Sequence, residues 1–234
     1  AVLGKSRMPE FGLNASTEFA DGPPTRNPWD PRRSVGGSSG GAAALVASGV
    51  VPLAHASDGG GSIRIPAAAA GLVGLKPTRG RHLDSPQARA LPVKIISEGV
   101  VSRTVRDTAA FVHAMEQRWR NPALPPIGRV LDASSRRLRI GVLDATIGPV
   151  ELDATTRRAL QDTATQLEDD GHHVEPVGLP VDERFALDFL HYWGLLSWLV
   201  AATGRQAIDP AFDPGRVDAL SVGLRRHAQR RLLE

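Results

Sequence analysis

Apolar and polar positions along this chain follow two periods, one typical of strands and one of helices, and the changes between them predict its elements. Residues 1–37 are rich in Gly, Pro, Asn and Asp, and read as an ordered loop region. A helix of small residues is predicted over 42–48, a strand over 50–56, and a second helical start from Ser62 into the alanine run 67–70. Two small-residue helices therefore flank one strand.

The second half of the chain predicts a βαβ unit. Residues 138–143 read as a strand, 153–169 as a helix that ends before Gly171, and 173–177 as another strand. Because a helical crossover joins parallel strands, we expect an α/β fold with a mixed, mainly parallel β-sheet core flanked by helices.

Between and after these segments lie two helices and a connector. Thr104 with Asp107 three residues later caps an amphipathic helix over 105–117, and residues 119–135 read as a connector. The longest apolar stretch, Phe189 to Ala202, falls short of the roughly 20 residues that a membrane span requires. A buried or groove-lining helix is expected there.

Composition narrows the class of protein. The 234 residues are 41% hydrophobic, which is enough for a sizeable core. The net charge is only +3, and Arg225, Arg226, Arg230 and Arg231 read as the solvated face of a helix, so nucleic acid is not an expected partner.

The absence of cysteine and the first residues of the sequence bear on the expected cellular location and exclude cysteine-dependent chemistry. There is no cysteine, which excludes disulfides, thiolate zinc sites and a cysteine nucleophile. The sequence begins with Ala1 and shows no basic segment leading into an apolar signal core, so a cytoplasmic location without membrane contact is expected.

Candidate chemistry is concentrated between Gly36 and Pro77. Ser38 and Ser62 are both embedded in glycine, and each precedes a predicted helix whose first N–H groups favour a developing oxyanion. Ser62 follows three glycines, whose missing Cβ atoms let backbone N–H groups turn towards one point. A serine nucleophile suits that position.

Three other interpretations of these residues stay open at this point. His55, Asp58 and Ser62 lie close in sequence, although the members of a catalytic triad usually converge from distant segments. Gly36-Gly37-Ser38-Ser39-Gly40 fits the nucleophile elbow of α/β-hydrolases, but prolines and charges stand where its strand should be. Nucleotide binding through the glycine loops is weaker, since no G-x-G-x-x-G occurs.

A longer ordered pattern resembles the amidase signature family of serine hydrolases. It consists of GGSSGG at 36–41, DGGGSIRIPA at 58–67 and GLKPT at 74–78, supported by MPEFG at 8–12 and GVVSRTVRD at 99–107. The predicted βαβ unit also resembles the segment that follows the signature in the family. The resemblance covers about residues 4–180.

The resemblance implies a Ser-cisSer-Lys triad. The nucleophile aligns with Ser62 and the bridging serine with Ser38, preceded by a cis peptide bond at Gly37–Ser38. The oxyanion hole aligns with the N–H groups of Gly59, Gly60 and Gly61. Structural support aligns with Ser39 and with an ion pair between Asp58 and Arg64.

The resemblance also implies a fold, an activity and partners. It predicts a single amidase-signature domain over 1–234, truncated, with the signature core at about 36–78 and the βαβ unit at about 138–177. The implied activity is hydrolysis of a small linear or cyclic carboxylic amide through an acyl-enzyme, with no metal or cofactor. A homodimer is left open.

One part of the family pattern has no match in this sequence. The catalytic lysine of the family lies upstream of the position of Lys5, and Lys5, Lys76 and Lys94 align elsewhere, so the chain alone is expected to be inactive. A non-catalytic pseudoenzyme and a subunit of the glutamyl-tRNA amidotransferase type are the alternative interpretations.

Overall fold

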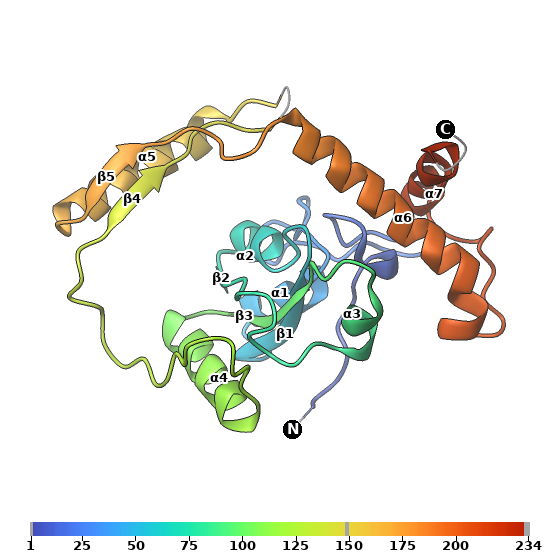
Figure 1. Cartoon of the computed structure of the whole chain (residues 1–234), viewed down its shortest axis with the longest axis horizontal. Helices are drawn as coiled ribbons and strands as arrows, with labels where there is room; N and C mark the ends of the chain where they lie inside the picture. Colours follow the sequence, from blue (N-terminus) through green and yellow to red (C-terminus); the bar gives the residue numbers. More distant parts are fainter. Residues whose placement is uncertain (1, 148–149, 232–234) are drawn as a thin grey trace.

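A computed structural model describes residues 2–147 and 150–231, in which helices alternate with short strands (Figure 1). The elements in chain order are η1 (Glu10–Gly12), α1 (Gly40–Ala47), β1 (Leu53–Asp58), α2 (Arg64–Ala70), β2 (Val73–Gly74), α3 (Pro86–Ala90), β3 (Ser97–Ser102), α4 (Val105–Arg118), β4 (Arg139–Val142), α5 (Ala154–Asp169), β5 (His173–Pro176), α6 (Glu183–Ala207) and α7 (Ala219–Arg231). The predicted domain of 1–234 therefore has its two ends outside the described residues.

The larger sheet has three strands in the order β1-β3-β2, and both of its pairs are antiparallel. The prediction of a mainly parallel core is therefore wrong for the described strands, although the α/β class and the mixture of directions are confirmed. The connection β1-α2-β2 does produce two strands of the same direction, as a crossover predicts. They are not neighbours, because β3 lies between them and runs the opposite way.

The second sheet is the predicted βαβ unit. Strands β4 and β5 pair in parallel from Arg139↔His173 to Val142↔Pro176, and α5 is the crossover between them. The Asp153 side chain caps α5 by accepting hydrogen bonds from two N–H groups of its first turn. Figure 1 shows this unit apart from the three-stranded sheet, beyond the connector that follows α4. Positions 148 and 149 of the predicted unit lie outside the described residues.

Small side chains let α1 and α2 approach the three-stranded sheet closely, as their composition predicts. One buried cluster joins the two helices to the sheet, and its members are Ala42, Val46, Ala56, Ile63, Ala67 and Val101. An added Cβ at Gly74 of β2 would lie 2.4 Å from the Cβ of Ala67 in α2. The packing therefore fixes where α2, and the loop before it, can sit.

Replacing Gly41 with alanine is expected to lower the free energy of unfolding by about 1–3 kcal/mol, the usual cost of overpacking. A Cβ there would lie 2.4 Å from the carbonyl oxygen of Arg7, whose backbone cannot move without displacing the loop around η1. Urea unfolding of the whole protein measures the change. Gly223→Ala on α7, where a Cβ meets nothing within 4 Å, is the matched control. An equal effect of the two changes would contradict the packing argument.

Most predicted boundaries hold within a few residues, and α6 is the main exception. The Thr104 cap is confirmed, since its side chain accepts from the Asp107 N–H at the start of α4. The expected apolar helix at 189–202 is part of the 25-residue α6. By length and composition alone, the whole of α6 could cross a membrane.

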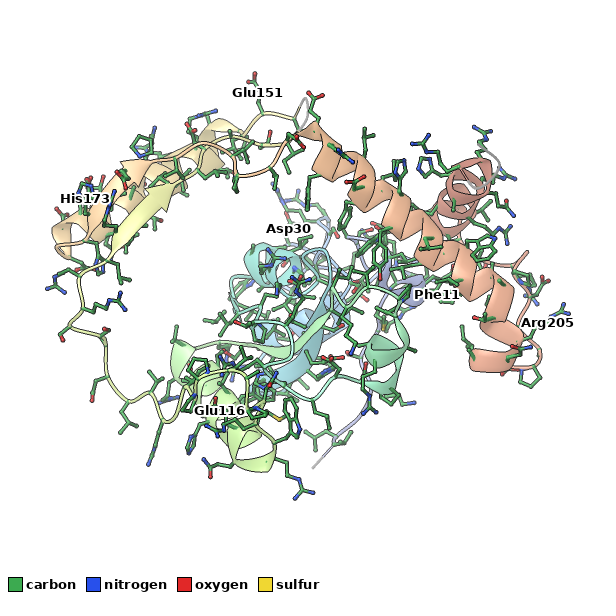
Figure 2. The ribbon with its side chains drawn as sticks, in the orientation of Figure 1. Phe11, Asp30, Glu116, Glu151, His173 and Arg205 are labelled. Atoms are coloured by element: carbon green, nitrogen blue, oxygen red, sulfur yellow. The ribbon has the colours of Figure 1, made fainter. Side chains whose placement is uncertain are left out.

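Helices α6 and α7 form a hairpin that is fixed to the N-terminal loop. The Ser197 hydroxyl of α6 donates to the Ser221 carbonyl of α7 at 2.7 Å. The Asp218 N–H donates to the Glu10 carboxylate of η1 at 2.7 Å. Phe11 of η1 points towards this hairpin (Figure 2), where its ring meets Phe212 edge to face at 6.0 Å. The hairpin therefore lies beside the loop that precedes α1.

Candidate active site

The loop between β1 and α2 is organised by one buried carboxylate. Asp58 ends β1 with no exposed side-chain surface, and it accepts hydrogen bonds from the N–H groups of Gly61 at 2.8 Å and Ile63 at 3.2 Å. The Arg64 guanidinium donates to both carboxylate oxygens at 2.9 Å. The implied ion pair between Asp58 and Arg64 is therefore confirmed, and it holds both sides of Ser62.

These contacts set the charge of the loop. Burial by itself would raise the pKa of Asp58, but the hydrogen bonds from Arg64 and from the Gly61 N–H outweigh it, so the pKa lies below the ordinary value of 3.8. Asp58 is thus an anion at neutral pH. All of its bonds are to the loop itself, which is a bracing role and not that of a proton acceptor for Ser62.

Ser38 and Ser62 lie on neighbouring segments, although their hydroxyls are not hydrogen-bonded to each other in the described structure. The Ser39 N–H donates to the Ser62 carbonyl at 3.3 Å, and the Ser39 hydroxyl meets the carbonyl of Ser57 at 3.4 Å. Ser38 is 4% exposed, and the Gly37–Ser38 peptide bond is cis, as the resemblance implies. Ser39 therefore joins the bridging-serine segment to the nucleophile loop.

The three glycines before Ser62 differ in their surroundings. The N–H of Gly61 donates to Asp58 and so serves the bracing of the loop. Gly60 is exposed and Gly59 is half-buried, and within the described residues their N–H groups have no hydrogen-bond acceptor. The N–H groups of Gly59 and Gly60 are therefore available to donate to an oxyanion, and their role in an oxyanion hole stays a prediction.

A cavity of about 260 Å³ opens beside Ser62. Its lining residues are Gly12, Leu13, Asn14, Ala15, Gly60, Ser62, Ile65, Phe189, Leu190, Trp193, Leu220 and Leu224. The residues of α6 and α7 in this wall were not among the predicted site residues. The sequence predicted a buried or groove-lining helix at 189–202, and Phe189, Leu190 and Trp193 of that helix do line the cavity, whereas nothing predicted Leu220 or Leu224 of α7.

The aromatic rings of α6 cover the glycine loop. Phe189 and Trp193 stack with their centroids 4.3 Å apart. A Cβ added at Gly60 would lie 2.7 Å from Cζ of Phe189 and 3.2 Å from Cη2 of Trp193. The Trp193 indole N–H donates to the Leu13 carbonyl at 2.9 Å, and the Tyr192 hydroxyl donates to the Val93 carbonyl at 2.6 Å. These bonds hold α6 against the site.

The described residues do not bring a base to Ser62. His55 of β1 faces across the sheet, where its Nε2 lies 2.9 Å from the Glu98 carboxylate, so the local Ser-His-Asp interpretation is not supported. Lys76 donates to the Ser97 hydroxyl and to the Pro77 carbonyl, both at 3.0 Å. Lys5 and Lys94 are exposed.

The nucleophile-elbow interpretation also finds no support in this geometry. The segment before Ser38 is a turn region with an isolated bridge between Arg26 and Ser34, and no strand leads into Ser38 as a nucleophile elbow requires. Among residues 2–147 and 150–231, no three His, Asp or Glu side chains are grouped so that they could hold a metal ion.

Comparisons with known proteins find similar sequences and structures. The sequence model of the family described as Amidase matches residues 1–209. The protein named "Putative amidase AmiC" from Mycobacterium leprae is 50% identical over 232 residues, which are 98% of this chain and 49% of that protein. The 6-aminohexanoate-cyclic-dimer hydrolase from a Pseudomonas species is 39% identical over 201 residues, 81% of this chain and 41% of that protein.

A solved structure of a similar protein has the same fold as this chain. The 6-aminohexanoate cyclic dimer hydrolase complexed with substrate superposes with a TM-score of 0.82 at 32% identity, and the match covers 97% of this chain and 49% of the solved chain. The chain therefore spans about half the length of the relatives that it matches.

Proposed function

The chain belongs to the amidase signature family, and on that premise we propose that the whole protein hydrolyses a carboxylic amide with Ser62 as its nucleophile. The observation that carries the proposal is the loop itself. Asp58 and Arg64 hold Ser62 at the mouth of a cavity, while the N–H groups of Gly59 and Gly60 beside it are left without acceptors in the described residues.

The proposed reaction begins with proton transfer from Ser62. As the Ser62 Oγ attacks the amide carbonyl, Ser38 accepts its proton and passes its own hydroxyl proton to a neutral amine base. The carbonyl oxygen becomes an oxyanion, which the N–H groups of Gly59 and Gly60 stabilise. The relay then protonates the leaving amine, and the C–N bond breaks to give an ester at Ser62.

Water completes the cycle by reversing the same proton path. The base and Ser38 remove a proton from the water as it attacks the ester carbonyl, and the carboxylic acid leaves as Ser62 regains its proton. Ser39 takes part through position only, since its N–H holds the Ser62 carbonyl.

We assign the base to a lysine that is not among these 234 residues. Lys76 is held by Ser97 and Pro77, and Lys5 and Lys94 are exposed away from the lining of the cavity. The resemblance to the family supplies the lysine, and the relatives, of which this chain spans about half, are long enough to contain it. The substrate is proposed to be an amide because the matching family model is described as Amidase and a relative that is 50% identical is named a putative amidase.

Labelling with a fluorophosphonate tests this proposal, because such probes phosphonylate only a serine whose hydroxyl is activated. We expect the whole protein to be labelled at Ser62, as mapped by mass spectrometry of its peptides, and the isolated 234-residue chain to be labelled far more slowly. The whole protein with Ser62→Ala controls for labelling elsewhere. Equal labelling of both chains would contradict the assignment of the base, and absence of labelling in the whole protein would contradict the proposed function.

A further inference from the structure

The cavity beside Ser62 has a mainly apolar wall. Its side chains come from the loop at Leu13, from α2 with Ile65, from α6 with Phe189 and Trp193, and from α7 with Leu220 and Leu224, and Asn14 is its polar, uncharged member besides Ser62. Among the described residues, no Asp, Glu, Lys, Arg or His lines it. The indole N–H of Trp193 is already bonded to the Leu13 carbonyl, so it offers no donor to a ligand.

The position of this wall relates it directly to the reacting atoms. Gly60, Ser62 and the ring of Phe189 line the same cavity, and the Phe189 and Trp193 rings lie against Gly60 itself. A group attached to a carbonyl carbon at Ser62 must pass along these rings. At about 260 Å³ the space is smaller than the pockets of roughly 300–1,000 Å³ that take drug-sized molecules, so it suits a compact group.

We propose that this cavity binds a compact, uncharged, apolar group attached to the scissile amide. Phe189, Trp193 and Leu220 then determine the preference of the enzyme for substrates that carry such a group. The inference rests on the proposed amide hydrolysis and adds a class of substrate to it. A carboxylate or ammonium in that position would lose its water without gaining a partner, because the wall supplies no counter-charge. An alkyl or aryl group is instead stabilised by contact with the rings and the leucines.

Two pairs of matched substrates test the proposal on the whole protein. The 4-nitroanilides of butyric and succinic acid carry acyl groups of equal length that differ by a terminal carboxylate. A second pair, N-butylacetamide and N-acetyl-4-aminobutyrate, places the same difference on the amine. We expect kcat/KM to favour the uncharged member by about 100-fold in at least one pair, which is the discrimination typical of an apolar pocket.

Variants connect the preference to this wall. Leu220 is 41% exposed, so lysine can replace it with its ammonium group at the cavity edge. Leu220→Lys is expected to reduce the ratio of kcat/KM for the uncharged over the charged substrate at least tenfold in the same pair. Leu220→Met is expected to leave this ratio unchanged. Phe189→Ala is expected to lower kcat/KM for the uncharged member. Leu187→Ala, also on α6, 56% exposed and outside the lining, is the control.

The rate of fluorophosphonate labelling at Ser62 gives a second readout that does not depend on amide turnover. An alkyl probe is expected to react faster than its carboxylate-bearing counterpart, and Leu220→Lys is expected to reduce that difference. If Ser62 is labelled but neither the substrates nor the probes are discriminated by charge, or if Leu220→Lys leaves the discrimination intact, the inference is overturned while the proposed function stands. Failure of all labelling at Ser62 overturns both.

Discussion

Ser62→Ala is expected to lower kcat/KM for amide hydrolysis by the whole protein about 10⁴–10⁶-fold, the range seen when a serine hydrolase loses its nucleophile. The proposed acyl bond forms at the Ser62 Oγ, and among the described residues Ser62 is the hydroxyl-bearing side chain in the lining of the cavity. The change removes one oxygen from a half-buried side chain and leaves the bond from the Ser39 N–H to the Ser62 carbonyl in place. The fold should therefore be unchanged.

Measuring hydrolysis of a matched uncharged amide by both proteins checks this expectation, with circular dichroism to show that the fold is retained. Ser39→Ala is the control, because Ser39 is adjacent to the site but its hydroxyl makes only long contacts of 3.4 Å with Ser57. Ser39→Ala should lower kcat/KM for amide hydrolysis much less than Ser62→Ala does. If Ser62→Ala kept more than about a tenth of the wild-type rate, another group would have to be the nucleophile.

Ser38→Ala separates the proton relay from the nucleophile. A general acid–base group contributes typically about 10²–10⁴-fold, so the loss should be smaller than that of Ser62→Ala. Ser38 is 4% exposed, and alanine removes only its hydroxyl oxygen, so the packing around this position should be kept. The double variant should be no slower than Ser62→Ala alone, because the relay has no function without the nucleophile.

The parts of this site that the sequence could predict are local ones. Ser62, the three glycines and the Asp58–Arg64 pair lie within seven consecutive positions, so one motif names them all. Caps such as Thr104 and Asp153 are local too, since a side chain bonds N–H groups two or three residues away. Such features follow from spacing and residue type alone.

The parts that the sequence could not predict depend on long-range contacts. Phe189 and Trp193 look like ordinary members of an apolar helix, and nothing in their neighbours shows that they meet Gly60. Strand β3 itself was not predicted, nor was its antiparallel pairing with β1 and β2, because strand pairing is a tertiary property that the βαβ rule does not fix for strands that are not adjacent. Substrate preference therefore had to be inferred from the structure, whereas the nucleophile could be inferred from the sequence.

Asp58→Asn is expected to lower both stability and activity. The buried carboxylate accepts from the N–H groups of Gly61 and Ile63 and from Arg64, and an amide would turn a donor towards one of them. Leaving buried N–H groups without an acceptor costs about 1–3 kcal/mol each, so we expect a loss of about 2–4 kcal/mol in the free energy of unfolding. We also expect kcat to fall about 10²–10³-fold, as when an oxyanion donor is displaced.

Arg64→Ala distinguishes the two halves of the pair. The Arg64 side chain is 55% exposed but its partner carboxylate is fully buried, so Arg64→Ala leaves that anion with its N–H bonds alone and is expected to cost about 1–3 kcal/mol, less than Asp58→Asn. Equal effects of the two changes would show that the ion pair, and not the N–H bonds of the buried carboxylate, holds the loop.

The pH dependence of unfolding gives an independent check on Asp58. Because the folded pKa of this carboxyl is below its ordinary value of 3.8, the stability it contributes is complete above that value and is lost as the pH falls through the folded pKa. The difference in unfolding free energy between the wild type and Asp58→Asn should therefore be constant near neutral pH and shrink below about pH 3.8. Urea unfolding of both proteins across this range measures it, and a difference that did not change with acid would mean that the charge of Asp58 does not hold the loop around Ser62.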